Sequence, residues 1–304
     1  MNRKESLIHF VKSIYQIWVS ERPTTLAAAL AYYSLFSFAP AIFIGITIAG
    51  IFFNEKEIIA RYLDRIEQTL GPEVAAFIQD SVISISQSST EGSALISIIG
   101  IIALFFAASM LFFQLQYALN TIWKVPPPRQ GTTLLLIKNR LLAFAMVIGI
   151  AVLIIASAML NLISSMFYSL IGLDDPLQLV NILGTIGLLT ISFALIYKIL
   201  PDVKIRWRDV WIGSTVTAVL VVVGVWLLGL YLQKAKVTSA FAAAGTVAVL
   251  LMTFYILAQI FLFGAVFTRV YASTFGTKII PDHTGQINEK ELSNEIEPGE
   301  NPLE

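Results

Sequence analysis

The residues best suited to chemistry in this chain are uncharged polar side chains set inside long apolar stretches. Ser157, Asn161, Ser165 and Tyr168 recur at intervals of four, four and three residues. This spacing places them along one face of a helix. Hydroxyl and carboxamide groups on that face could line a wet groove through which a polar head group moves, or they could form hydrogen bonds between neighbouring helices. The sequence leaves both interpretations open.

Two other apolar stretches carry similar neutral groups. The first holds Tyr33, Ser37 and Pro40, and the second holds Gln116 and Asn120. A proline inside a helix removes a backbone donor and kinks the helix. We therefore expect a binding or gating site near Ser37 and Pro40, although a purely structural kink explains the same residues. The candidate groove comprises Tyr33, Ser37, Pro40, Gln116, Asn120, Ser157, Asn161 and Ser165.

Charged residues gather at the turn that follows the fourth apolar stretch. Pro201 ends that stretch, and Asp202 can pair with a neighbouring Lys or Arg. The basic residues of this turn suit anionic phosphate head groups. The alternative is that they only anchor the protein at the cytoplasmic face, where short loops carry an excess of Lys and Arg. The predicted head-group rim consists of Lys198, Asp202, Arg206 and Arg208.

Helices long enough to cross a membrane must position these groups. Six apolar stretches, none containing Asp, Glu, Lys, Arg or His, each reach the ~20 residues that a helix needs to cross ~30 Å of hydrocarbon. They are too long and too continuously apolar for barrel strands, which alternate every second residue. The sequence therefore predicts an all-α polytopic membrane protein. Its six transmembrane helices are expected at Thr25–Phe53, Ala94–Leu119, Leu141–Tyr168, Pro176–Tyr197, Val210–Leu232 and Ala244–Thr268.

The composition supports a membrane protein and excludes several functions. The chain is 57% hydrophobic and 13% charged, whereas an average soluble domain is about 25% charged. It contains no cysteine and has a net charge of zero, so it offers neither thiolate metal ligands nor the basic surface that binds nucleic acid. The apolar stretches lack the carboxylates of ion-coupled transporters. We expect no metal, no cofactor and no nucleic-acid partner, while homo-oligomerisation stays open.

The basic residues also predict how the chain crosses the membrane. Only five of the 20 fall in the segments expected on the outer side: Lys56, Arg61, Arg65, Lys234 and Lys236. The others lie in the N-terminal segment, in the second and fourth loops, and in the C-terminal tail. Because cytoplasmic loops carry the excess of Lys and Arg, both termini should face the cytoplasm.

The segments outside the apolar stretches define three parts of the chain. Residues 1–24 carry apolar side chains at helical spacing opposite polar ones, which predicts an amphipathic helix. This helix could lie on the inner leaflet or pack as a cap on the bundle. Residues 25–270 form the six-helix domain, whose outer loop, 54–93, should contain two short amphipathic helices that cover a cavity mouth or only pack. Residues 271–304 read as an acidic, disordered cytoplasmic tail.

Four segments of this chain combine into a recognisable set of motifs: Leu26 to Pro40, Ala118 to Trp123, Tyr197 to Asp202 followed by Trp207-Arg208, and Gly264-Ala265. Together they resemble the YihY/virulence factor BrkB family of bacterial inner-membrane proteins. The resemblance covers residues of about 5 to 275. It implies a six-span plasma-membrane protein, with suggested roles in envelope integrity, serum resistance and the export of lipids or solutes.

Members of that family have also carried the label ribonuclease BN, and the sequence argues against this activity. A metal-dependent nuclease needs clustered His and carboxylate ligands. The chain has two histidines, His9 and His283, and neither has a partner at ligand spacing. No glycine-rich phosphate loop is apparent, so direct ATP-driven pumping has no support. We therefore expect a protein that is not an enzyme.

Two functions remain. The leading hypothesis is that the protein transports or translocates a lipid or another amphiphile through the neutral polar groove, with membrane lipids as partners. The alternative is a non-transporting scaffold for assembly of the cell envelope.

Overall fold

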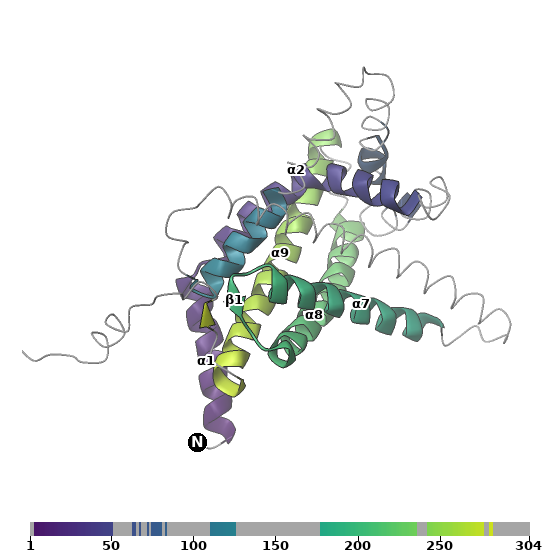
Figure 1. Ribbon diagram of the computed structural model, residues 1–304. Helices are drawn as coiled ribbons and strands as arrows, with labels where there is room; N and C mark the ends of the chain where they lie inside the picture. The colour runs from purple at the N-terminus through teal and green to yellow at the C-terminus, as the bar shows by residue number, and fades with distance from the viewer. Residues whose placement is uncertain are drawn as a thin grey trace, which may run out of the picture.

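The computed structural model describes residues 3–50, 63–64, 67, 72, 74–80, 83, 110–125, 177–235, 242–276 and 280–281 (Figure 1). Two stretches of this part are helical without a label, at 74–80 and at 110–122. The labelled elements are α1 (Arg3–Ser20), α2 (Pro23–Gly50), α7 (Leu177–Ile199), β1 (Val203–Lys204), α8 (Trp207–Ala235), α9 (Ala242–Phe275) and β2 (Ile280–Pro281). Apart from one short strand pair, these elements are helices, which confirms the predicted helical class.

Three of the described helices are long and apolar enough to cross a membrane. The candidate spans are Ile182–Ile199 in α7, Trp207–Leu232 in α8 and Gly245–Phe275 in α9. They coincide with the fourth, fifth and sixth apolar stretches. The first stretch falls on α2, the described helix 110–122 holds only the end of the second, and the third lies outside the described residues. The count of six spans therefore stays a prediction.

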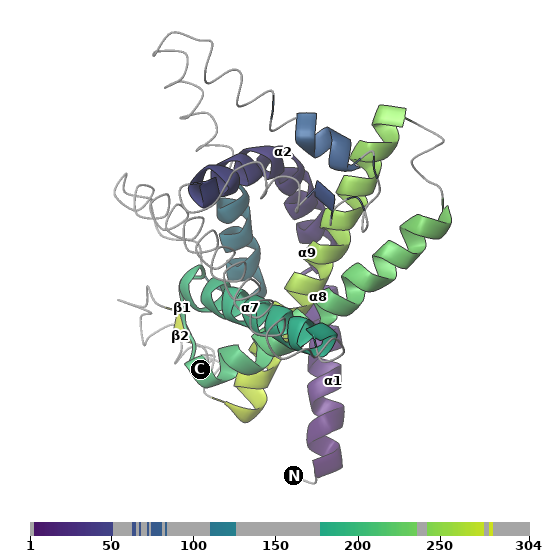
Figure 2. The same cartoon turned by 90° about the vertical axis from the view of Figure 1, so that its right-hand side faces the viewer.

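The helix α9 lies at the centre of the arrangement. It packs against α1, α2 and α8, while α7 packs against α8. Figure 2 shows α8 and α9 close together near α7 and diverging towards their other ends. Most of the described elements are therefore held in place through α9.

The close part of the α8–α9 contact depends on a reciprocal pair of glycines and threonines. A Cβ added to Gly264 would overlap the Thr217 hydroxyl, and one added to Gly213 would overlap the Thr268 hydroxyl. Each threonine also donates to the carbonyl of the glycine on its own helix, Thr217 to Gly213 at 2.8 Å and Thr268 to Gly264 at 2.7 Å. Small residues that let backbones approach in this way are typical of helix pairs in membranes.

Two hydrophobic cores lie at opposite ends of α9. The large core contains buried residues from α2, helix 110–122, α7, β1, α8 and the C-terminal part of α9, among them Leu30, Ile122, Tyr197 and Val266. The small core contains Val74, Ile78, Val249 and Leu250. The helical stretch 74–80 belongs to the predicted outer loop. Its buried residues Val74 and Ile78 pack against Val249 and Leu250 of α9.

The helices α1 and α2 meet at a sharp junction. Arg22 has a positive φ of 46°, and its carbonyl accepts the first hydrogen bond of α2, from the Thr25 backbone N–H at 3.0 Å. Pro23 occupies the first helical position, where its missing N–H costs nothing. The ribbon of α2 changes direction along its length (Figure 1), as expected of a helix that contains Pro40.

A short strand pair connects the end of α9 to the α7–α8 turn. Val203 pairs with Pro281, and Lys204 pairs with Ile280, in antiparallel register. This end of the bundle, which carries the large core, is called the strand end below. The disordered tail from residue 271 stays a prediction, and α9 itself continues to Phe275.

Candidate functional site: a polar cluster at the strand end

Residues of the predicted groove and of the predicted rim meet in one polar cluster. The Asn120 side-chain amide donates to Asp202 Oδ2 at 2.9 Å, and the Gln116 amide donates to the same oxygen at 3.3 Å. In return, the Asp202 backbone N–H donates to Asn120 Oδ1 at 3.0 Å. No sequence pattern joins these two sets, because Asn120 and Asp202 are 82 residues apart in the chain.

Local structure fixes both partners of this contact. Gln116 and Asn120 are four residues apart on helix 110–122 and therefore share one face. That helix ends in a Schellman motif: Lys124 has a φ of 53°, its N–H bonds the Thr121 carbonyl, and the Val125 N–H bonds the Asn120 carbonyl at 2.9 Å. On the other side, Pro201 stops α7 directly before Asp202.

The cluster rests on a buried aromatic group of the large core. The Tyr197 hydroxyl donates to the Phe261 carbonyl at 2.6 Å and lies 3.2 Å from the Thr217 hydroxyl. The Trp123 indole N–H donates to the Ala265 carbonyl at 3.2 Å, and its ring meets Tyr197 edge to face. Both aromatic polar atoms thus find a backbone acceptor, as buried groups require. These bonds tie α7 and the end of helix 110–122 to α9, a few residues along the chain from Asn120 and Asp202.

The basic residues of the predicted rim have different environments. Lys198 donates to the Ile205 carbonyl and lies 5.8 Å from the centre of the Trp207 ring, so it is used within the α7–α8 turn. Arg206 and Arg208 are exposed. Trp207 and Trp211 are also exposed, which suits indole rings at the level of lipid head groups. Two arginines and two tryptophans therefore border the polar cluster on the chain.

The groove residues on α2 do not take part in the cluster. Ser37 is buried, and its hydroxyl donates to the Tyr33 carbonyl of the same helix at 2.7 Å. Pro40 lies within α2. The remaining groove residues, Ser157, Asn161 and Ser165, lie outside the described residues. Of the eight predicted groove residues, the described part of the chain therefore places Gln116 and Asn120 together at Asp202.

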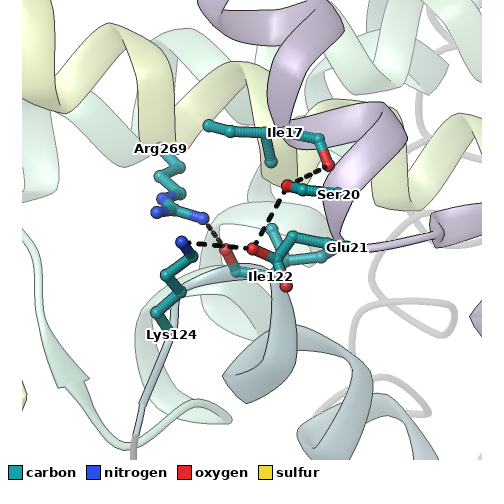
Figure 3. Close-up of polar contacts among 6 residues, drawn as sticks. All are labelled: Ile17, Ser20, Glu21, Ile122, Lys124 and Arg269. Atoms are coloured by element: carbon teal, nitrogen blue, oxygen red, sulfur yellow. Dashed lines mark hydrogen bonds and ion pairs between the residues drawn. The ribbon is translucent and has the colours of Figure 1, made fainter.

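A second set of polar contacts joins α1, helix 110–122 and α9 (Figure 3). Arg269 donates to the Ile122 carbonyl at the end of helix 110–122, and Lys124 forms an ion pair with Glu21 at 3.6 Å. The Ser20 hydroxyl donates to the Ile17 carbonyl at 3.3 Å. Sequence reasoning counted Arg269 and Lys124 only as markers of membrane orientation. Nothing in the sequence indicated that Arg269 contacts Ile122 or that Lys124 pairs with Glu21.

The sequence analysis also missed the residues that support the cluster. Trp123, Tyr197 and Gly264 belong to the motifs that carry the family resemblance, but no contact between them was predicted. The usable signal was the Gly-x-x-x-Thr spacing, which occurs at Gly213 in the fifth apolar stretch and again at Gly264 in the sixth. Among the residues that the structure describes, no group of three or more His, Asp or Glu could hold a metal ion.

Comparison with known proteins identifies a family. A family model described as "Virulence factor BrkB" matches residues 14–284. A UPF0761 membrane protein of Legionella pneumophila is 26% identical over 69% of this chain, and one of Pseudomonas aeruginosa is 24% identical over 85%. One of Cronobacter sakazakii is 28% identical over 71% of this chain and 73% of its own length. This chain spans about half the length of the Legionella protein and 62% of the Pseudomonas protein. No solved structure matches it.

Proposed function

Since this chain belongs to the virulence factor BrkB family of membrane proteins, we propose that it translocates a lipid or another amphiphile across the bacterial plasma membrane. The polar head of the substrate passes the cluster of Gln116, Asn120 and Asp202, while its apolar part stays in the lipid. Both termini face the cytoplasm, so the strand end with its polar cluster lies at the cytoplasmic face of the membrane.

The contact between Asn120 and Asp202 carries this proposal. It brings a carboxylate and two carboxamides together at the end of apolar helices, where polar groups are expensive and usually functional. Hydrogen bonds between an amide and a carboxylate can be exchanged for bonds to a head group without covalent chemistry. The path is therefore polar but not wholly neutral, because Asp202 belongs to it.

The surroundings of the cluster support an amphiphilic substrate. Arg206 and Arg208 are exposed beside the same turn and suit the phosphate of a lipid head group. The exposed indole rings of Trp207 and Trp211 also suit the level of the lipid head groups. A substrate with a phosphate and an apolar tail would contact both groups on its way to Asp202.

Reconstitution of the full-length protein tests the proposal. Liposomes with fluorescent phospholipids in both leaflets are treated with an impermeant quencher, and the fraction that becomes accessible is followed over time. We expect the protein to accelerate exchange between leaflets and the double substitution Arg206→Gln, Arg208→Gln to slow it. Liposomes whose lipids exchange no faster than in protein-free controls, across anionic and zwitterionic head groups, would contradict the proposal.

A non-transporting scaffold is the alternative, and one observation favours it. Hydroxyls within the helices donate to carbonyls of their own helix, as Ser37, Thr217 and Thr253 do. These hydroxyls stabilise their own helices, and their single O–H is not available to donate to a substrate. A scaffold predicts a stable partner in cross-linking experiments and unchanged lipid exchange in the Asn120→Ala protein.

A further inference from the structure

The helix α1 has two sets of apolar residues, and one of them packs against other described parts of the protein. Phe10 packs edge to face on Phe267, and Trp18 packs edge to face on Phe263. Ile14 and Ile17 also pack against the large core. These four residues follow helical spacing, so one side of α1 is committed to α9.

The other apolar face of α1 is exposed, and no described residue is recorded as packing against it. Ile8, Val11, Tyr15 and Val19 are spaced three, four and four residues apart and therefore lie on one side of the helix. Their exposed fractions are 69%, 61%, 69% and 56%. We call these four residues the α1 stripe. An exposed apolar face of this length is typical of a surface that docks onto a membrane or a partner.

The charged residues beside the α1 stripe indicate whether a membrane or a protein partner covers it. Lys4 and Lys12 each lie four residues from Ile8, and Glu5 lies three residues before it, so two basic residues and one acidic residue share this side of α1 and leave it with a net positive charge. Lysines keep an ammonium group in water while their stems cover apolar surface, and they are attracted to anionic lipids. A second copy of the chain would bring the same basic residues against each other. The basic border therefore suits an anionic lipid surface.

The position of α1 along α9 agrees with this occupant. Trp18 contacts Phe263, while Phe10 contacts both Phe267 and Phe275, so α1 runs antiparallel to the last part of α9. The candidate span of α9 ends at Phe275. The α1 stripe therefore runs beside the last part of this span, between the levels of Phe263 and Phe275, where the span approaches the head groups.

We propose that the α1 stripe docks into the head-group region of an anionic leaflet, while the Phe10 face of the same helix holds α9. The sequence alone placed residues of both sets, among them Ile8, Val11, Ile14, Tyr15 and Trp18, on a single apolar face. The structure divides them between protein and lipid. This inference does not depend on lipid translocation, since a scaffold would use the same attachment.

Site-directed spin labelling tests the proposal cleanly, because the chain has no cysteine to remove. Single cysteines replace Ile8, Val11, Tyr15 and Val19 in the full-length protein, which is reconstituted in vesicles of phosphatidylethanolamine and phosphatidylglycerol. Ser13→Cys and Gln16→Cys are the matched controls on the polar side of the same helix. The measurement compares collisions of each label with oxygen, which concentrates in lipid, and with a nickel chelate, which stays in water.

We expect the stripe labels to collide mainly with oxygen and the two control labels mainly with nickel. Adding Lys12→Gln should lower the docked population roughly fivefold, since one basic residue near an anionic surface is worth about that factor. Vesicles of phosphatidylcholine alone should produce a similar loss. These outcomes together would support the proposal.

Two other outcomes would overturn it. Stripe labels that collide with nickel as often as the Gln16→Cys label would show that water covers the stripe. Spin–spin broadening at the stripe that disappears when labelled protein is diluted with unlabelled protein would show that a second copy covers it. Every substituted stripe residue is exposed, so loss of the fold does not complicate the comparison.

Discussion

The large core and the small core occupy opposite ends of α9, and they differ in how many elements they join. At the strand end, α2, helix 110–122, α7, β1 and α8 all contribute buried residues beside α9. At the other end, the described buried residues come from the stretch 74–80 and from α9, and partly buried Leu35 of α2, Leu63 and Leu232 of α8 pack against them. The polar cluster lies at the strand end. A site that holds Asp202 between two amides needs rigid surroundings. We expect the strand end to be the more rigid of the two ends, because more elements contribute buried residues there.

Polar interactions increase the difference between the cores. The large core contains hydrogen bonds from Trp123 and Tyr197 to backbone carbonyls of α9, and it includes the close α8–α9 approach at Gly264. The small core consists of aliphatic and aromatic residues, which pack without directional bonds. We expect the strand end to unfold with the whole bundle and the other end to open locally.

The substitution Gly264→Ala should give the largest loss of stability. Its Cβ would overlap the Thr217 hydroxyl and lie 2.6 Å from the Tyr197 hydroxyl, so α8 and α9 must separate. We expect the free energy of unfolding in detergent to fall by about 1–3 kcal/mol. Gly187→Ala is the matched control, since its Cβ would meet nothing within 4 Å and alanine favours helix. Equal melting temperatures for the two variants would remove the argument for a tightly packed strand end.

Paired isoleucine substitutions compare the two cores directly. Ile122 is buried in the large core and Ile78 in the small core. Each Ile→Val change removes one methylene and costs about 0.5–1.5 kcal/mol where the site is fixed. We expect Ile122→Val to lower the midpoint of global unfolding, and Ile78→Val to speed amide hydrogen exchange only in residues 74–80. A larger global effect from Ile78→Val would reverse the proposed order of the two ends.

Tyr197→Phe isolates one hydrogen bond of the large core. The ring stays in place, while the bonds to the Phe261 carbonyl and the Thr217 hydroxyl are lost. Such bonds within membrane helices contribute about 0.6 kcal/mol on average and about 1.7 at most. Tyr32→Phe serves as control because Tyr32 is exposed. Melting curves in detergent should separate the two variants, and a greater loss in Tyr32→Phe would contradict the assignment.

The smallest effect is expected for the ion pair between Glu21 and Lys124. The Lys124 side chain is 64% exposed, so water screens the pair. Glu21→Gln should change the free energy of unfolding by less than about 1 kcal/mol. The difference from wild type should shrink further in concentrated salt. A large, salt-independent loss would mean that Glu21 has a structural role at the α1–α2 junction beyond this pair.

Composition and hydrophobic pattern predicted the helical membrane class and the positions of α2, α7, α8 and α9. Such patterns are readable because each residue in a span must suit hydrocarbon, so the signal accumulates over ~20 residues. The outer loop 54–93, expected to contain two short helices, includes the helical stretch 74–80. The predicted number of spans and the orientation of the termini stay predictions.

The site itself could be predicted only in pieces. Gln116, Asn120 and Asp202 were all selected, but as members of two separate sites, because pairing across 82 residues depends on how helices pack. Lys198 was assigned to the rim from its charge alone, whereas its ammonium group donates a hydrogen bond to the Ile205 carbonyl. Tyr197 and Gly264 act through a close helix approach that no single-helix pattern reveals.

Lipid exchange by the Asn120→Ala protein tests the central claim most directly. Thr121→Ala is the matched control, since Thr121 is the next residue of the same helix and its hydroxyl donates only to the Tyr117 carbonyl. Both proteins are reconstituted at equal density after their melting temperatures have been compared. The account predicts that exchange falls to the protein-free rate with Asn120→Ala and stays at the wild-type rate with Thr121→Ala. Wild-type exchange by a folded Asn120→Ala protein would contradict a translocation path at Asp202.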